Sequence, residues 1–137
     1  MFKKFLLLAS AGLMAIGPAV AAEKVKIGFV TTITTPAGVI GKDMVDAVNL
    51  AMEDIDSKMA GLDVELIVED DGFKPAIGKQ KTDKLVKQDK VQFVTGFIWS
   101  HVLLASQKSA LGAGKFLISS NAGPSQMAGK LCHKNFF

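Results

Sequence analysis

The chain contains no arginine and no tyrosine, and it has a single tryptophan and a single cysteine. All sixteen basic residues are lysines, so the bidentate clamp that a guanidinium forms on a carboxylate or phosphate is excluded. An anionic ligand must instead be held by lysines, hydroxyls, amides or backbone N–H groups. The formal net charge of +3 includes Lys3 and Lys4 of the N-terminal segment. Because the remaining charge is small and the lysines are dispersed, we expect no nucleic acid partner.

The sequence also lacks the patterns of catalytic and cofactor sites. The only two histidines, His101 and His133, belong to no His or Cys spacing typical of a metal site. No G-x-G-x-x-G follows the first apolar run, which argues against a dinucleotide. Ser100 precedes His101, but neighbours at a helix start point in different directions, and no G-x-S-x-G surrounds this serine. We therefore expect no catalytic residue, no metal and no cofactor, and an exported α/β enzyme is the least favoured function.

The first residues have the pattern of a secretory signal. Lys3 and Lys4 precede the apolar run 5–16, and the small residues 19–21 end the segment. The run is shorter than the about 20 residues that cross a membrane. We predict a signal peptide over residues 1–21, cleaved near Ala21, and one domain over residues 22–137. In an exported chain the lone Cys132 is either buried or paired with a cysteine outside this sequence.

Strand and helix patterns alternate along the rest of the chain. The helical patterns run from Gly41 to Met59, over 76–90 and over 100–111. The strand patterns cover residues 25–30, 62–68, 91–95 and 116–118. This alternation predicts an α/β fold, a parallel sheet with helices on both faces.

Two loops close strands of this sheet with small polar residues: 96–100, Gly-Phe-Ile-Trp-Ser, and 119–123, Ser-Ser-Asn-Ala-Gly. The carboxyl ends of parallel strands share one edge, where small ligands bind. Ser100 is the predicted N-cap of the following helix, whose unpaired N–H groups suit a carboxylate. Two alternatives remain equally open: Ser100 and Asn121 contact a ligand, or they only cap the helix and turn the chain. Trp99 is either core or pocket wall.

The acidic turn 69–71, Glu-Asp-Asp, also ends a strand. Such a cluster can hold Mg²⁺ or act as a phosphoacceptor. No second carboxylate group ends another strand, so a solvated turn is the favoured interpretation.

Several segments together resemble the periplasmic leucine/isoleucine/valine-binding protein family, the type I solute receptors of branched-chain amino acid ABC transporters. These segments are the signal peptide, Val25-Lys26-Ile27-Gly28-Phe29-Val30, the run 35–41 (Thr-Pro-Ala-Gly-Val-Ile-Gly), Ala47-Val48-Asn49-Leu50-Ala51, the two loops, and residues 132–137. The resemblance covers the whole chain and rests on the order and spacing of the segments. It implies two α/β lobes that close on a ligand, with this chain as an incomplete N-terminal lobe and the second lobe absent.

The resemblance also implies roles for individual residues. Ser100 matches the hydroxyl that binds the ligand carboxylate, and Asn121 and Gly123 match positions that complete the grip. Ile40 stands where amino-acid binders often have an aromatic wall, and Trp99 beside Ser100 suits a flat ligand. The predicted ligand-binding residues are these five together with their loop neighbours His101 and Ala122.

The implied function is periplasmic capture of a branched-chain amino acid or a related carboxylate or amide and its delivery to an ABC permease in the inner membrane. The alternative is the ligand-sensing domain of a receptor or regulator with the same fold. The fragment alone is expected to bind poorly, because half of a closing cleft leaves the ligand exposed.

Overall fold

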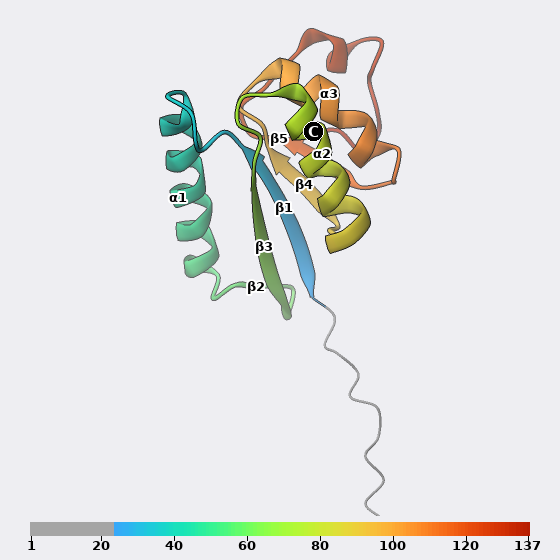
Figure 1. Cartoon of the computed structure of the whole chain (residues 1–137). Coiled ribbons are helices and arrows are strands. Elements are labelled where there is room, and N and C mark those ends of the chain that lie inside the picture. The colour runs from blue at the N-terminus through green and yellow to red at the C-terminus, as the bar shows by residue number, and fades with distance from the viewer. Residues whose placement is uncertain (1–23) are drawn as a thin grey trace, which may run out of the picture.

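The computed structural model describes residues 24–137, so the predicted signal peptide lies outside the described residues (Figure 1). Strands and helices alternate as the sequence pattern predicts. The strands are β1 (Val25–Thr31), β2 (Lys58–Met59), β3 (Leu62–Asp70), β4 (Phe93–Gly96) and β5 (Phe116–Ser119). The helices are α1 (Gly38–Asp54), α2 (Pro75–Lys84), the π-helical turn η1 (Leu85–Asp89), α3 (Ser100–Leu111) and the 3₁₀ turn η2 (Ser125–Ala128).

The five strands form one sheet in the order β2-β3-β1-β4-β5. β1 pairs in parallel with β3, from Val25 opposite Val64 to Thr31 opposite Asp70, and with β4 on its other side. β5 extends the parallel arrangement, and only β2 runs antiparallel, against β3. The predicted α/β class with a parallel sheet is confirmed, and the carboxyl ends of four strands lie at one edge.

The predicted bounds of the first helix are wrong at both ends, because it begins at Gly38 instead of Gly41 and stops early. The first helix does not reach Met59, because Asp56 and Ser57 adopt left-handed backbone conformations with φ near +50° and the chain turns into β2. The second predicted helix loses its α geometry at Leu85 and continues as η1. Lys90, with φ of +59°, then ends it. Side-chain periodicity does not contain this information, because both stops are backbone turns.

One face of the sheet is covered by α2, η1 and α3 and carries the core. Gly28 lets Leu85 approach β1 closely: a Cβ on this glycine would lie 2.8 Å from Leu85 Cδ1. Val30, Val94 and Leu117 are fully buried beneath the same layer. Leu85 and Val86 of η1 are buried in this layer, whereas Ile77 of α2 is only partly buried. This packing holds the starts of α2 and α3 at the carboxyl edge.

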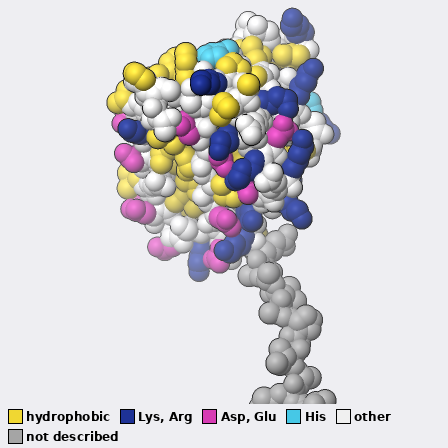
Figure 2. All heavy atoms as spheres, viewed as in Figure 1, with side chains coloured by type: hydrophobic (Ala, Val, Ile, Leu, Met, Phe, Trp, Pro, Cys, Tyr) yellow, Lys and Arg dark blue, Asp and Glu magenta, His cyan; other side chains and the backbone are white. Residues whose placement is uncertain are grey.

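The other face of the sheet is only partly covered. There α1 packs beside Phe29, but its only buried residues are Gly38 and Gly41. A hollow of about 320 Å³ is lined by Ile27, Met59, Phe93, Thr95 and Ile118. Figure 2 shows hydrophobic side chains gathered on the side of the molecule where α1 lies. Helices are therefore present on both faces, as predicted, but α1 leaves apolar sheet surface exposed.

None of the helices between residues 24 and 137 combines the length and the apolar character that a membrane crossing requires.

Candidate functional site

The two loops singled out in the sequence lie against each other at the carboxyl edge of the sheet. The Asn121 side chain donates from Nδ2 to the Ile98 carbonyl at 2.9 Å. The Ala122 N–H donates to the Phe97 carbonyl at 3.0 Å, and Ser120 Oγ donates to the Gly96 carbonyl at 3.1 Å. The prediction that these loops meet at one edge is confirmed.

A sharp backbone turn after β4 brings the first loop into place. Gly96 has φ of +99°, and a Cβ there would lie 2.3 Å from the Val30 carbonyl oxygen. Only glycine fits so close to the neighbouring strand. Phe97 follows with φ of +62°, and its N–H donates to the same Val30 carbonyl at 2.7 Å. Its ring is fully buried, so the turn is anchored in the core.

Ser100 is the first residue of helix α3 and not its N-cap, so the predicted N-cap is wrong. Trp99 holds the cap position in an extended conformation, without a side-chain cap bond. Its carbonyl accepts the N–H groups of Val102 and Leu103 at 3.1 and 3.0 Å. Within residues 24–137 no acceptor bonds the N–H groups of Ser100 and His101, and both side chains are exposed. The helix start therefore offers N–H donors and a hydroxyl to solvent.

Trp99 is partly buried, and its side chain contacts residues of two other loops. The indole is partly buried against the core, and its Nε1 donates to Thr32 Oγ1 at 3.0 Å. The Phe73 ring meets it edge to face with centroids 4.8 Å apart, and the same ring lies 5.1 Å from the His101 ring. Phe73 is therefore a member of this aromatic group that the sequence did not single out. Nothing in its local pattern signals the contact.

The remaining predicted residues differ in exposure. Gly123 and Asn121 are exposed, whereas Ala122 is buried, with 5% of its surface accessible. The Ala122 N–H is already bonded to Phe97, and its carbonyl accepts the Ser119 hydroxyl. Ile40 is 43% exposed in the first turn of α1, which Figure 1 shows apart from α3. The structure thus brings Trp99, His101 and Asn121 together around Ser100 and leaves Ile40 on a separate element.

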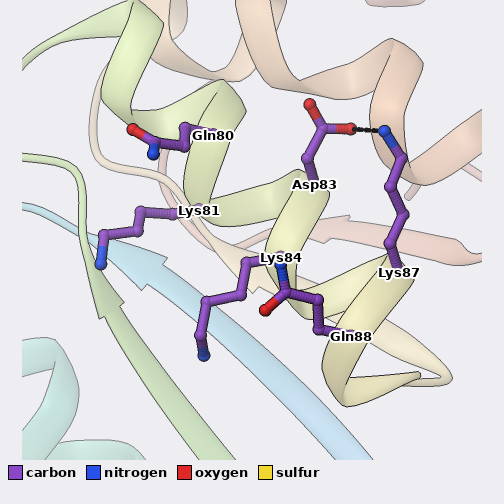
Figure 3. Close-up of a pocket in the computed structure, with 6 residues that line it drawn as sticks. All are labelled: Gln80, Lys81, Asp83, Lys84, Lys87 and Gln88. Carbon is purple, nitrogen blue, oxygen red and sulfur yellow. Dashed lines mark ion pairs between the residues drawn. The ribbon is translucent and has the colours of Figure 1, made fainter.

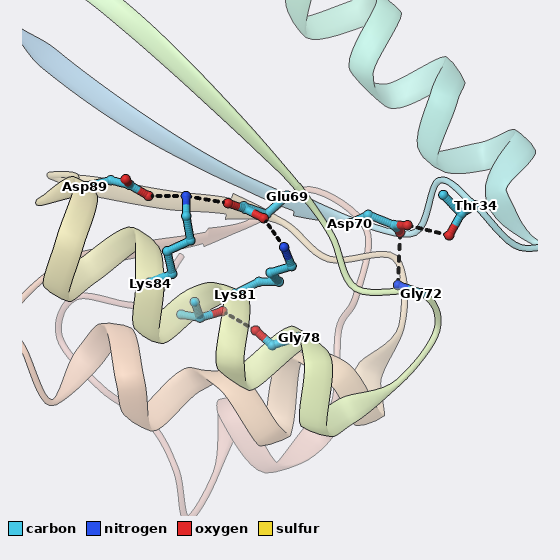
Figure 4. Close-up of polar contacts among 9 residues, drawn as sticks. Thr34, Glu69, Asp70, Gly72, Gly78, Lys81, Lys84 and Asp89 are labelled. Carbon is cyan, nitrogen blue, oxygen red and sulfur yellow. Dashed lines mark hydrogen bonds and ion pairs between the residues drawn. The ribbon is translucent and has the colours of Figure 1, made fainter.

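The acidic turn is not the solvated turn that the sequence favoured. Its three carboxylates diverge, and Asp71 is fully buried while Glu69 is 8% exposed. Asp70 accepts hydrogen bonds from Thr34 Oγ1 and from the Gly72 N–H (Figure 4). Among residues 24–137 no group of histidine, cysteine or acidic side chains is arranged to hold a metal ion.

Glu69 instead connects β3 to α2 through two lysines. Lys81 and Lys84 each lie 2.7 Å from one of its carboxylate oxygens, and Lys84 also reaches Asp89 (Figure 4). Burial on its own would raise the pKa of Glu69, but the hydrogen bonds from the two lysines outweigh it and hold the pKa below its usual value. This cluster fixes α2 on the sheet.

A lysine-rich hollow of about 360 Å³ lies on α2 and η1, away from the two loops. Its lining residues are Gln80, Lys81, Asp83, Lys84, Lys87 and Gln88 (Figure 3). Asp83 pairs with Lys87 at 2.9 Å and with Lys79 at 2.6 Å. Hydrogen bonds from these lysines lower the pKa of Asp83 to about 2. Lys81 and Lys84 pair with Glu69 outside the hollow. Because each of its charged side chains has an ionic partner, this hollow has the character of a stabilised helix surface.

Cys132 is an exposed free thiol, so the alternative that it is buried is wrong.

The architecture is that of an α/β lobe with a mostly parallel sheet, with polar loops and a helix start at the carboxyl edge of the sheet. Residues 24–137 match the periplasmic binding protein family, and the chain belongs to this family. Its members are the substrate-binding proteins of ABC transporters. No significant match was found among curated proteins.

Solved structures with the same fold include an ABC transporter substrate-binding protein from Sphaerobacter thermophilus. It is 27% identical, with a TM-score of 0.79 over 84% of this chain and 32% of its own. The branched-chain amino acid binding protein LivJ from Streptococcus pneumoniae, in complex with isoleucine, is 26% identical, with a TM-score of 0.77 over 84% of this chain and 33% of its own.

A solute-binding protein from Rhodopseudomonas palustris, in complex with 3,4-dihydroxybenzoic acid, is 28% identical. Its TM-score is 0.73 over 76% of this chain and 29% of its own. The chain thus spans about a third of the length of these relatives.

Proposed function

We propose that the chain is part of the ligand-binding lobe of a periplasmic ABC-transporter receptor for a small organic carboxylate. The observation that carries the proposal is the start of α3, where the N–H groups of Ser100 and His101 and the Ser100 hydroxyl face solvent between Trp99 and Asn121. A helix N-terminus carries about half a positive charge. It can hold a carboxylate without arginine, which this chain lacks.

Each residue of the edge has a separate role in the proposal. The Ser100 hydroxyl and N–H bind one carboxylate, and the exposed Gly123 and Asn121 line the opposite side. The Asn121 amide nitrogen is committed to Ile98, so its carbonyl oxygen is the group that remains for a ligand ammonium or amide. Ala122 supports the loop by its backbone bonds, and Ile40 contacts an apolar part of the ligand from α1.

Two carboxylate classes fit this edge. A branched-chain amino acid is supported by the isoleucine complex of the Streptococcus relative. An aromatic acid is supported by the 3,4-dihydroxybenzoic acid complex of the Rhodopseudomonas relative. The row of aromatic rings formed by Trp99, Phe73 and His101 beside Ser100 also favours a planar ligand, because such rings attract one another beyond simple burial. The receptor then delivers its ligand to an inner-membrane permease.

The proposal is tested by titrating the ¹⁵N-labelled chain with isoleucine and with benzoate at millimolar concentrations. Amide shifts confined to residues 98–101 and 121–123 are expected. Ser100→Ala should weaken the binding by about 1–3 kcal/mol, since a charged carboxylate loses a donor. The control is Ser57→Ala, in the turn between α1 and β2. Equal affinities of wild type and Ser100→Ala, or shifts centred elsewhere, would contradict the proposal.

The affinity of the chain for a ligand also tests whether this edge alone makes a complete binding site. Pockets bury most of a ligand's surface, whereas the edge described here is open on one side. We expect isothermal calorimetry on the 137-residue chain to detect no micromolar binding of either ligand. A micromolar dissociation constant would show that this edge is sufficient by itself.

A further inference from the structure

Asp71 has an unusual environment for a loop carboxylate. It follows β3 at the carboxyl edge and has no accessible surface. Its Oδ1 accepts two hydrogen bonds, from Thr32 Oγ1 at 2.5 Å and from the Phe73 N–H at 2.8 Å. Its Oδ2 is buried and has no partner within residues 24–137. Burial of a carboxylate is costly unless the group is hydrogen-bonded. The two donors to Oδ1 therefore indicate which contacts the buried Asp71 serves.

The first partner connects Asp71 to Trp99. Thr32 is also fully buried, and its hydroxyl lies between the carboxylate and the indole Nε1, which is 3.0 Å away. A carboxylate only accepts and an indole N–H only donates. The Thr32 hydrogen must therefore point to Asp71, and its lone pair must face Trp99. The direction of every bond in this chain of three residues is fixed.

The second partner connects Asp71 to the other side of the same indole. Phe73 has φ of +65°, which is unfavourable for a residue with a side chain. Its N–H bond to Asp71 Oδ1 holds the backbone in this conformation. The ring then contacts Trp99 and His101. The hydrogen bond to the indole and the ring contact with Phe73 thus both involve a single carboxylate oxygen of Asp71.

Trp99 is the N-cap residue of α3 and has no side-chain cap bond, so its backbone orientation depends on how the indole is held. We infer that Asp71 and Thr32 are positioning residues, which hold Trp99 and thereby aim the N–H groups and hydroxyl at the start of α3. This inference rests on the proposed function for its consequence on binding, but the positioning itself is measurable without a ligand. Neither residue touches the ligand in this arrangement.

Trp99 is the only tryptophan of the chain, so its indole N–H gives a single resonance whose exchange with solvent can be followed. We expect this proton to exchange at least tenfold more slowly in the wild-type chain than in urea-unfolded chain. Thr32→Val should abolish that protection, while the amide of buried Val94 exchanges as in the wild type. Thr32→Ser keeps the hydroxyl and should restore protection. The matched control is Thr34→Val, which lies in the same loop but bonds to Asp70.

Asp71 is tested by a pair of variants. Asp71→Ala should expose both the indole N–H and the Phe73 amide to exchange, whereas Asp71→Asn keeps an oxygen acceptor and should retain both within threefold. Unprotected indole exchange in the wild type, or equal protection in Thr32→Val and wild type, would overturn the inference. Because the first comparison needs only the wild-type chain, it stands even if a variant does not fold.

A benzoate titration of the same samples separates positioning from the proposed function. The benzoate dissociation constant is obtained from the shift of the Ser100 amide. Thr32→Val should raise this constant at least tenfold, and Thr32→Ser should raise it less than threefold. Equal affinity in wild type and Thr32→Val, with indole protection lost, would refute the consequence for binding. If neither benzoate nor isoleucine shifts Ser100 in the wild type, the proposed function fails, while the exchange rates still decide whether Asp71 and Thr32 hold the indole.

Discussion

Replacing Gly28 with alanine should destabilise the protein, and shortening Leu85 at the same time should remove part of that destabilisation. The new Cβ would lie 2.8 Å from Leu85 Cδ1 and within 3.2 Å of two further atoms of that side chain. Carbon atoms pack at about 3.5–4.0 Å, so the Leu85 side chain must shift. Leu85 has no accessible surface and little room to move.

The expected magnitudes follow from the packing. Overfilling a core costs about 1–3 kcal/mol, and replacing glycine within a strand returns about 0.5–1 kcal/mol. Leu85→Ala alone should cost about 2–5 kcal/mol through the cavity it leaves. In the double variant the alanine methyl at position 28 enters that cavity. We therefore expect the double variant to lose about 1–2 kcal/mol less free energy of unfolding than the sum of the losses in the two single variants.

Urea unfolding followed by far-ultraviolet circular dichroism gives the four free energies of unfolding that this cycle needs. The control cycle combines Gly28→Ala with Val102→Ala, because Val102 lies against Gly78 of α2. That pair should be additive within about 0.5 kcal/mol. Additivity of Gly28→Ala with Leu85→Ala would refute the view that Leu85 rests on the glycine.

Three further predictions concern other parts of the molecule. Asp83→Asn should cost about 0.5–1 kcal/mol at pH 7. Since the pKa of Asp83 is lowered to about 2, this contribution is present above about pH 4 and is lost as the pH falls through 2. The test compares the melting temperatures of the wild type and Asp83→Asn at pH 7 and near pH 2, with Glu53→Gln as control. Exposed Cys132 should react with a maleimide in the native protein as fast as in urea, and strong protection would contradict the structure. Gly96→Ala should lower the urea midpoint by more than Gly114→Ala, because only Gly96 faces a backbone oxygen at 2.3 Å.

The sequence predicted the parts of the fold that depend on side-chain periodicity. Apolar runs such as Val25 to Val30 placed the strands, and their parallel direction then placed the two loops at one edge. The turn after α1 was missed because it depends on left-handed backbone at Asp56 and Ser57, which no periodic pattern records. Trp99 and the small residues of the edge were found for the same reason as the strands, because they follow apolar runs directly, whereas Phe73 was missed.

The contacts that organise the candidate site were beyond sequence reasoning. Asp71 in a Glu-Asp-Asp turn has the local pattern of a solvated residue, and its burial depends on Thr32, which lies on another loop. Ser100 was predicted as N-cap because serine favours that position. Trp99 takes it instead, since its indole bond to Thr32 holds the extended backbone that a cap requires. Long-range partners, not local preferences, decided both outcomes.

The position of β1 in the sheet has a consequence for the order of folding. This strand is the first to emerge during synthesis, yet it lies in the middle of the sheet, with Val25 opposite Val64 and Ile27 opposite Phe93. Its second neighbour, β4, is made only after α1, β2, β3, α2 and η1. Pairings so distant in sequence form slowly, and an apolar strand without neighbours is prone to aggregate. The segment from β1 through η1 therefore emerges before β4 can pair with β1 and close the core around it.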